Sequence, residues 1–255
     1  MKIVTWNVNS VRARLPQVEL FIKEQQPDIL LLQELKCEEH VFPSALEDYG
    51  YNCALLGQKT YNGVAILSKY PIEDVQRGIS NFDDTTSRYI EAFTGGIRVA
   101  SVYVPNGQEV NSKAYEYKLH FLDALYEHIK NLLTLDEQFI IGGDFNIAPT
   151  DEDVYAPDLW REQVLCSTPE RAAWRKITYL GLTDALIQFD GNQTKNPYTW
   201  WNYRIPFVKD CGLRIDHLLL SPNATDSLKS STVHKYMRGL ERASDHAPVE
   251  CVITI

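Results

Sequence analysis

The chain has 255 residues, of which 44% are hydrophobic and 23% are charged, and its formal net charge is −9. This length suffices for a substantial buried core, and no linker, repeat or low-complexity tract divides the sequence, so we expect residues 1–255 to form a single domain. The longest apolar runs are too short to cross a bilayer, and the first residues begin a strand-like pattern instead of a signal peptide. We therefore expect a soluble protein with no membrane partner.

The five cysteines are widely spaced, odd in number and contain no CxxC pair. This pattern argues against a disulfide framework and against a zinc site. It is typical of a protein that works in the reducing cytoplasm.

The negative net charge argues against a nucleic-acid partner, but the charge is unevenly distributed. Between Arg171 and Arg242 there are 11 Lys or Arg residues against 6 Asp or Glu. Phosphate contacts depend on the local face, so an acidic protein can still bind DNA through one basic surface. A solvated surface of mixed charge explains this segment equally well.

The first 34 residues have the pattern of a strand, a helix and a second strand. Residues 2–7 alternate as a strand that ends at Asn7, a helical periodicity follows with Ser10 as its expected N-cap, and residues 28–34 form a buried strand that ends at Glu34. Such a unit usually places its strands parallel, so Asn7 and Glu34 should emerge at one edge of a sheet. The alternative for Glu34 is an ordinary solvated acid.

Residues 51–104 contain short β-like segments at 51–56, 63–68, 88–93 and 97–104, which suggest antiparallel pairing. A Pro-Asn-Gly turn then presents Tyr103 and Asn106 near the end of a strand. Ser112 is the expected cap of a long amphipathic helix. Its two histidines, His120 and His128, lack acidic partners in the local sequence, so we expect them on the surface.

The stretch QFIIGGDFN, residues 138–146, follows that helix. Its apolar residues 139–141 predict a short buried strand, and two glycines are expected to end it. Asp144 and Asn146 are two residues apart and would share a face of an extended chain, which puts a carboxylate beside an amide. The alternative is a simple turn, because Gly, Asp and Asn are also common turn residues.

The last third of the chain begins with loops and a helix predicted at 169–180. Residues 196–207 then place five aromatic side chains among polar ones, which suits either a core or a surface that stacks on bases. A strand at 214–220 carries Asp216. The final strand, 249–255, follows the pair Asp245 and His246.

Acidic and amide residues thus stand at the ends of at least three strands, and one active site is the economical explanation. Such a set offers oxygen ligands for Mg²⁺, a histidine for proton or phosphate chemistry and neutral hydrogen-bond donors. The sequence contains neither a GxxxxGK loop nor an HExxH helix. The candidate residues are Asn7, Glu34, Tyr103, Asn106, Asp144, Asn146, Asp216, Asp245 and His246.

Six motifs that span the chain, TWNVNSVRAR, LLQELK, VYVPNG, GGDFNIAPT, GLRIDHLLLS and SDHAPV, resemble the exonuclease III family of DNA-repair endonucleases within the endonuclease/exonuclease/phosphatase superfamily. The resemblance implies an α/β fold of the DNase I type, a four-layer sandwich of two mixed sheets with helices outside. It implies Mg²⁺-dependent cleavage 5′ to abasic sites, with Mn²⁺ as a substitute, and 3′ to 5′ exonuclease and 3′-phosphatase activities. The implied partner is double-stranded DNA with abasic sites or blocked 3′ ends. The resemblance also implies a monomer that works in a bacterial-type cytoplasm, in association with the nucleoid.

The resemblance also assigns a role to each matching residue. Glu34 corresponds to the principal metal carboxylate, with Asn7 and Asp245 close by. Asp144 corresponds to the residue that activates or orients the attacking water, and Asn146 to its amide neighbour at the phosphate.

His246 corresponds to the histidine that contacts the scissile phosphate, and Asp216 orients it. Tyr103 and Asn106 correspond to donors on the phosphate side. Motif matching leaves open how Asp144, His246 and Tyr103 divide the proton transfers.

A third group is expected to contact DNA. Trp200, Leu213 and Ile215 match the region of a lesion-recognition pocket, which varies across the family. Arg204, Lys209 and Arg214 are expected to hold flanking phosphates. Two positions depart from commoner family patterns. Leu35 stands where many relatives have threonine, and Asn9 stands where some have aspartate.

Two other functions fit parts of this pattern. One is another phosphodiesterase or phosphatase of the superfamily, acting on generic DNA, a lipid or an inositol phosphate. The other is a catalytically silent DNA-binding module, which is disfavoured because Glu34, Asp144, Asn146 and His246 are all present.

Overall fold

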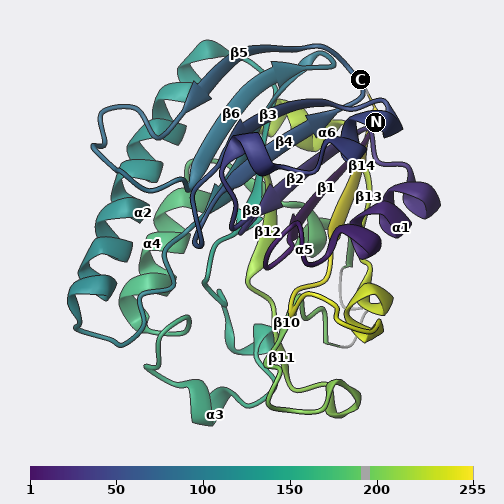
Figure 1. Cartoon of the computed structure of the whole chain (residues 1–255). Helices are drawn as coiled ribbons and strands as arrows, with labels where there is room; N and C mark the ends of the chain where they lie inside the picture. Colours follow the sequence, from purple (N-terminus) through teal and green to yellow (C-terminus); the bar gives the residue numbers. More distant parts are fainter. Residues whose placement is uncertain (191–195, 255) are drawn as a thin grey trace.

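The computed structural model describes residues 1–190 and 196–254. Two six-stranded sheets pack face to face, and the longest helices cover their outer faces, so the predicted four-layer α/β sandwich is confirmed (Figure 1). The first sheet has the order β13 (Leu228–Val233), β14 (Val249–Ile253), β1 (Lys2–Asn7), β2 (Ile29–Gln33), β4 (Val64–Ser68) and β3 (Asn52–Leu56). The second has the order β5 (Ile72–Arg77), β6 (Tyr89–Thr94), β7 (Ile97–Tyr103), β8 (Phe139–Asp144), β12 (Asp216–Leu220) and β9 (Thr183–Asp184).

Both sheets are mixed, and the pairing sets which side chains meet at their edges. Strand β1 runs parallel to β2, as the sequence predicted, with Asn7 opposite Gln33. Strand β7 runs parallel to β8, with Tyr103 opposite Asp144, while β12 is antiparallel to β8 and brings Asp216 opposite Asp144. Polar side chains at these strand ends therefore converge.

The two sheets approach closely at the glycines of β8. Strand β8 continues through Gly142 and Gly143 to Asp144, so the expectation that the glycines end the strand was wrong. A Cβ on Gly143 would lie 1.9 Å from the carbonyl oxygen of Val102, and one on Gly142 would lie 2.8 Å from Leu31 of the opposite sheet. The glycines are needed for this close packing, which the local turn propensity did not reveal.

The helices of the outer layers are α1 (Leu15–Gln25) on the first sheet and α2 (Lys113–Leu132) and α4 (Thr168–Thr178) on the second (Figure 1). Ser112 caps α2 as predicted, because its side chain accepts a hydrogen bond from the backbone N–H of Tyr115. Helix α1 begins four residues later than expected. Ser10 has φ of 87°, and its N–H bonds to the carbonyl of Glu34, so this segment forms a turn against the Glu34 loop and not a helix cap.

The shorter α-helices are α3 (Pro157–Trp160), α5 (Ala185–Asp190) and α6 (Pro222–Asp226), and β10 (Trp200–Trp201) pairs with β11 (Gly212–Leu213) in a two-stranded ribbon. Strands β5 and β13 were not predicted. Both lie at sheet edges and are rich in polar residues, so their apolar alternation is weak. The predicted strand at 214–220 begins only at Asp216.

The surface position expected for the two helix histidines holds for His120 and is wrong for His128. His128 is buried, and its Nε2 lies 2.7 Å from Oε2 of Glu91. Glu91 also receives the hydroxyl of Tyr89 and an ion pair from Arg98. The acidic partner comes from β6, which is distant in sequence, so the helix sequence alone gave no sign of it.

The cysteines form no disulfide in the described residues, and all five are free. Among the same residues, no helix has the length and apolar character of a membrane span.

Candidate functional site

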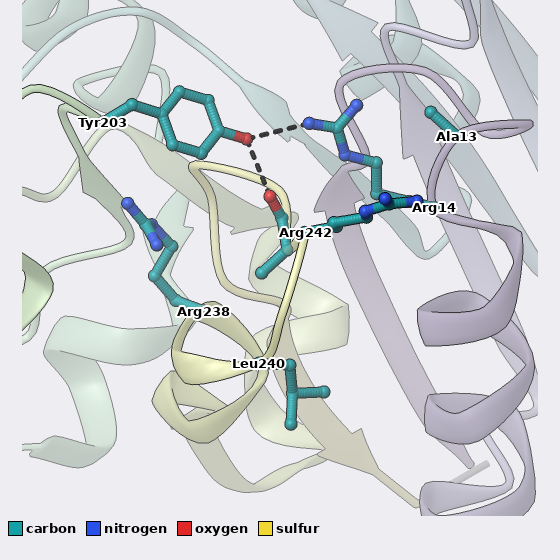
Figure 2. A pocket seen from close by; sticks show the side chains of 7 residues that line it. Ala13, Arg14, Tyr203, Arg238, Leu240 and Arg242 are labelled. Atoms are coloured by element: carbon teal, nitrogen blue, oxygen red, sulfur yellow. Dashed lines mark hydrogen bonds between the residues drawn. The ribbon is translucent and has the colours of Figure 1, made fainter.

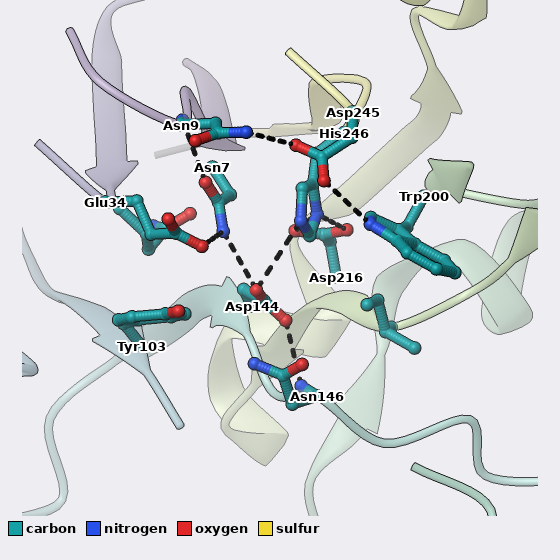
Figure 3. A network of polar contacts seen from close by, with 12 residues as sticks. Asn7, Asn9, Glu34, Tyr103, Asp144, Asn146, Trp200, Asp216, Asp245 and His246 are labelled. Atoms are coloured by element: carbon teal, nitrogen blue, oxygen red, sulfur yellow. Dashed lines mark hydrogen bonds and ion pairs between the residues drawn. The ribbon is translucent and has the colours of Figure 1, made fainter. Parts of the chain in front are cut away.

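The candidate site lies at the edge where the two sheets meet, around the ends of β1, β7 and β8 (Figure 3). Asn7, Tyr103 and Asp144 are the last residues of these strands. Glu34 follows β2, and His246 stands shortly before β14, the antiparallel neighbour of β1. Nearly all of the residues predicted to form one site are thus brought together.

Asn7 connects two carboxylates from different sheets. Its side-chain amide donates hydrogen bonds of 2.9 Å to Oε1 of Glu34 and 2.9 Å to Oδ2 of Asp144. Its oxygen accepts from the backbone N–H of Asn9, which fixes the orientation of the amide. In this structure Asn7 is a hydrogen-bond bridge, and its assignment as a metal ligand stays a prediction.

Glu34 is held in an ionised state at the rim of the site. Burial opposes ionisation, but the ammonium of Lys36, 2.7 Å from Oε2, and the amide of Asn7 outweigh it and lower the pKa of Glu34. The backbone of Glu34 has φ of 53°, a left-handed conformation that costs energy for a side chain of this kind. An ionised carboxylate at this position suits a hard cation.

His246 and Asp216 form a buried pair. Nδ1 of His246 lies 2.8 Å from Oδ2 of Asp216, and its Nε2 lies 3.7 Å from Oδ2 of Asp144. Burial opposes the charged imidazole, but Asp216 and Asp144 outweigh it and raise the pKa of His246 to about 10. The ring is therefore cationic at neutral pH and can stabilise negative charge on a phosphate.

Asp144 is almost fully buried, with 1% exposure. Burial raises its pKa to about 7, although the His246 cation acts in the opposite direction. Its Oδ1 accepts the backbone N–H of Asn146 at 2.9 Å, so the carboxylate cannot swing away from the strand end. A carboxylate with a pKa near the working pH is suited to accept a proton from water.

Tyr103, Asn106 and Asn146 line one side of this centre. The Asn106 amide donates to Oδ1 of Asn146 at 3.1 Å, and the Asn146 amide donates to the carbonyl of Val104 at 3.0 Å. Burial first, then the nearby carboxylates Glu34 and Asp144, raises the pKa of Tyr103 well above its usual value. Tyr103 is consequently a neutral phenol that can donate a hydrogen bond.

Asp245 faces the other side of His246. Its Oδ1 accepts from the amide of Asn9 at 2.9 Å, and its Oδ2 accepts from the indole of Trp200 at 3.0 Å. The asparagine at position 9 therefore gives Asp245 a hydrogen-bond donor. Both carboxylate oxygens are engaged, and the predicted role of Asp245 at a metal remains a prediction.

The donor set at the centre fits a divalent cation. Ligand atoms of Glu34, Asp144 and His246 all lie within 4.8 Å of one another. The two carboxylates supply hard oxygen ligands of the kind that Mg²⁺ and Mn²⁺ prefer, and no thiolate lies in this group. The charged state of His246 suits it to the phosphate and not to the cation.

The basic residues expected to contact DNA differ in their exposure to solvent. Arg214 is only 2% exposed, and its guanidinium is paired with Asp153 at 2.6 Å and with Asp184 at 2.5 Å, so its assignment to a flanking phosphate was wrong. Arg204 and Lys209 are exposed, as a phosphate contact requires.

Leu213 and Ile215 are buried in one apolar cluster, against which the half-buried Trp200 packs. Of these three side chains, Trp200 is the one that reaches the surface. Leu213 and Ile215 therefore support Trp200 from behind, and the existence of a lesion pocket here stays a prediction.

Two lysines of the site were missed in the sequence. Lys36 neutralises Glu34, and its position two residues later in LLQELK was the available signal. Lys118 is fully buried on α2 and donates to the backbone carbonyls of Asn106 at 3.1 Å and Asn146 at 2.6 Å. Its spacing from Tyr115 and Leu122 places it on the apolar stripe of the helix, which was the signal for it.

Comparisons with known proteins identify the family of this chain. The model of the endonuclease/exonuclease/phosphatase family matches residues 4–246. The chain is 34% identical over 267 residues to an exodeoxyribonuclease III from Haemophilus influenzae, covering 98% of each chain.

Two solved structures are similar over their whole length. A 3′ phosphatase from Neisseria, bound to a product DNA hairpin, has a TM-score of 0.96 at 44% identity, with 100% of both chains covered. An AP endonuclease from Archaeoglobus fulgidus has a TM-score of 0.95 at 35% identity, again with 100% of both chains covered. This chain therefore belongs to the endonuclease/exonuclease/phosphatase family.

Proposed function

We propose that this protein is a DNA-repair nuclease that hydrolyses the phosphodiester 5′ to abasic sites and removes nucleotides and phosphate from 3′ ends. The observation that carries the proposal is the continuous chain of contacts from Glu34 through Asn7 and Asp144 to His246 and Asp216. It combines a cation-binding carboxylate, a base and a phosphate-binding cation in one site. The names of the relatives, exodeoxyribonuclease and AP endonuclease, support the substrate.

Asp144 is assigned to activate the attacking water. Its pKa of about 7 leaves a large ionised fraction at neutral pH, so the carboxylate can take the proton of a water placed in line with the phosphorus. The N–H of Asn146 holds one oxygen and leaves the other directed toward Asn7 and His246. Asp144 is thereby aligned before the substrate arrives.

Three neutral or cationic hydrogen-bond donors are assigned to stabilise the negative charge of the phosphate. His246, kept cationic by Asp216, stabilises the charge that develops on the phosphate oxygens. Tyr103 remains a phenol, and Asn106 presents an exposed side chain, so both can donate hydrogen bonds from the opposite side. Asn146 connects Asn106 to the strand that carries Asp144.

Glu34 is the carboxylate that we assign to Mg²⁺, or to Mn²⁺ in its place, with Asn7 and Asp245 as the further assigned ligands. Asp144, whose carboxylate lies in the same group of ligand atoms, is assigned to the attacking water. When bound, such a cation neutralises phosphate charge and stabilises the leaving 3′ oxygen. Lys36 already balances one charge at Glu34 and keeps the carboxylate ionised.

Preference for abasic sites is assigned to Trp200. An abasic nucleotide has no base to unstack, so its extrusion costs roughly a few kcal/mol less than that of an intact nucleotide. The hydrogen bond of Trp200 to Asp245 and its packing against Leu213 and Ile215 stabilise one orientation of the indole ring. Arg204 and Lys209, which are exposed, are assigned to flanking phosphates, a kind of contact that does not select the lesion.

The cellular context follows from the same assignment. We propose that residues 1–255 act as one domain and as a monomer on double-stranded DNA with abasic sites or blocked 3′ ends. Its relatives include bacterial exodeoxyribonucleases, which supports a place at the nucleoid in the cytoplasm.

A duplex with one abasic analogue, labelled at each end in turn, tests the proposal. With Mg²⁺ we expect a single incision 5′ to the analogue and, separately, shortening from the 3′ end. Hydrolysis of inositol phosphates or lipid phosphodiesters, with the duplex left intact, would identify another activity of the superfamily.

Trp200→Ala tests the lesion assignment, with Trp174→Ala as the matched control, because Trp174 is a buried tryptophan of helix α4. We expect Trp200→Ala to lower the ratio of abasic to intact cleavage, whereas the control loses stability and all activities together. An unchanged ratio in folded Trp200→Ala places lesion recognition elsewhere.

A further inference from the structure

A pocket with a volume of about 510 Å³ lies where the start of α1 meets the segment between β13 and β14 (Figure 2). Three arginines line it together with Tyr203, and we call it the arginine pocket, defined by Arg14, Arg238 and Arg242. Its volume is in the range of pockets that hold a nucleotide-sized ligand. The three guanidinium groups give this pocket a positive charge, although the net charge of the chain is −9.

Arg238 is the most buried of the three, with 8% exposure. Its guanidinium carbon lies 5.0 Å from the centre of the Tyr203 ring and 5.3 Å from that of Phe207, so two aromatic faces hold it. Its Nε is buried without a hydrogen-bond partner in the described part of the chain. The rings fix the position of the cation but leave this donor unused.

Arg14 is also held in place without a counter-charge. Its Nη1 donates to the carbonyl of Asn9 at 2.8 Å, and its Nε has no partner among the described residues. Its Nη2 donates to the hydroxyl of Tyr203 at 3.1 Å (Figure 2). Tyr203 in turn donates to the carbonyl of Ala243 at 2.8 Å. Within residues 1–190 and 196–254, neither these two arginines nor Arg242 forms an ion pair with a carboxylate.

A buried guanidinium without an acid is costly for a fold that has no use for it. Arg98 and Arg214 elsewhere in the chain are each paired with at least two carboxylates. The cost is balanced where an anion arrives with a ligand, and the planar fork of arginine matches the oxygens of a phosphate. The ordered side chains also reduce the entropy lost on binding.

The arginine pocket adjoins the candidate site. Asn9, whose carbonyl is bound by Arg14, donates its amide to Asp245, and Asp245 accepts from Trp200. These contacts link the wall of the pocket to Trp200, the residue assigned to the lesion. We propose that the arginine pocket binds a phosphodiester of the DNA backbone that neighbours the cleaved phosphodiester. This inference rests on the proposed function.

The test compares two substrates for each variant. One is the abasic duplex, and the other is bis(p-nitrophenyl) phosphate, a small diester that has no neighbouring phosphate. For the double variant Arg14→Gln/Arg242→Gln we expect the ratio of kcat/KM on DNA to kcat/KM on the small diester to fall by roughly tenfold, the effect of one charge-assisted contact. Arg238→Gln is a second variant of the same pocket.

Arg175→Gln is the matched control, because Arg175 is an exposed arginine of α4, which lies away from α1 in Figure 1. It should keep the wild-type ratio. Duplex affinity measured in excess EDTA should also become less salt-dependent in the pocket variants, by about one unit of log–log slope for each phosphate that the pocket no longer binds.

Three outcomes overturn the proposal. Equal losses on both substrates would mean structural damage, and an unchanged ratio with an unchanged salt slope would mean that no phosphate is held. If inorganic phosphate raises the Tm of the wild type but not of the variants, while their DNA affinities match, the pocket binds a free anion. A wild type that binds duplex without cleaving it would refute the proposed nuclease function, and the EDTA binding measurements would still decide the pocket.

Discussion

The buried ion pair between Lys118 and Glu170 gives the sharpest stability prediction. Both side chains have 0% exposure, and the pair joins helix α2 to helix α4 behind the candidate site. Lys118→Met would leave the Glu170 carboxylate buried without its cation, which costs about 3 to 5 kcal/mol. In a protein of this size the corresponding fall in Tm is about 6 to 20 °C.

An exposed ion pair between the same two helices supplies the control. Lys176 of α4 and Asp123 of α2 lie 2.9 Å apart, but their side chains are 47% and 64% exposed. Lys176→Met should therefore cost no more than about 1 kcal/mol. Equal losses for Lys118→Met and Lys176→Met in urea denaturation would refute the argument from burial.

The double variant Lys118→Met/Glu170→Gln separates stability from positioning. It leaves no unpaired charge, so we expect it to regain most of the lost stability. It still lacks the ammonium that donates to the carbonyls of Asn106 and Asn146, so kcat/KM on the abasic duplex should remain roughly 10- to 100-fold low. Wild-type kcat/KM in the stable double variant would show that this ammonium does not position the site.

The remaining predictions concern the reaction and acid stability. Asp144→Asn and His246→Ala should each lower kcat by at least about 10²-fold while duplex affinity is largely kept, and near-normal turnover by either folded variant would refute its assigned role. Chelation with EDTA should abolish cleavage and added Mg²⁺ or Mn²⁺ should restore it, whereas full activity after trace metal is stripped would exclude a cation. Despite burial, Arg214 and His217 hold the pKa of Asp184 below its unfolded value, so its contribution to stability is present above about pH 4 and is lost as the pH falls toward the folded pKa. Denaturation of Asp184→Asn across acidic pH should therefore show a weaker dependence on pH than the wild type, and an equal dependence would contradict this assignment.

The sequence by itself determined most of the strands, the parallel pairing of β1 with β2 and the gathering of acids at strand ends. These features follow from local periodicity and from the rule that parallel neighbours end at the same edge. Asn7, Glu34 and Asp144 were predictable for that reason, because each stands at or directly after the end of a strand. His246 precedes the start of β14, and it was predicted from its pairing with Asp245 and from the SDHAPV motif.

Only the tertiary structure decided which polar side chains are paired inside the protein and which remain available to a ligand. Arg214 and Arg238 are both buried arginines of the basic segment, yet Arg214 meets two carboxylates and Arg238 meets two aromatic rings. His128 and Lys118 share helix α2 and find acids on β6 and α4. The partners lie tens of residues away in sequence, and the charge of a buried group depends on which of them the fold brings within hydrogen-bond distance.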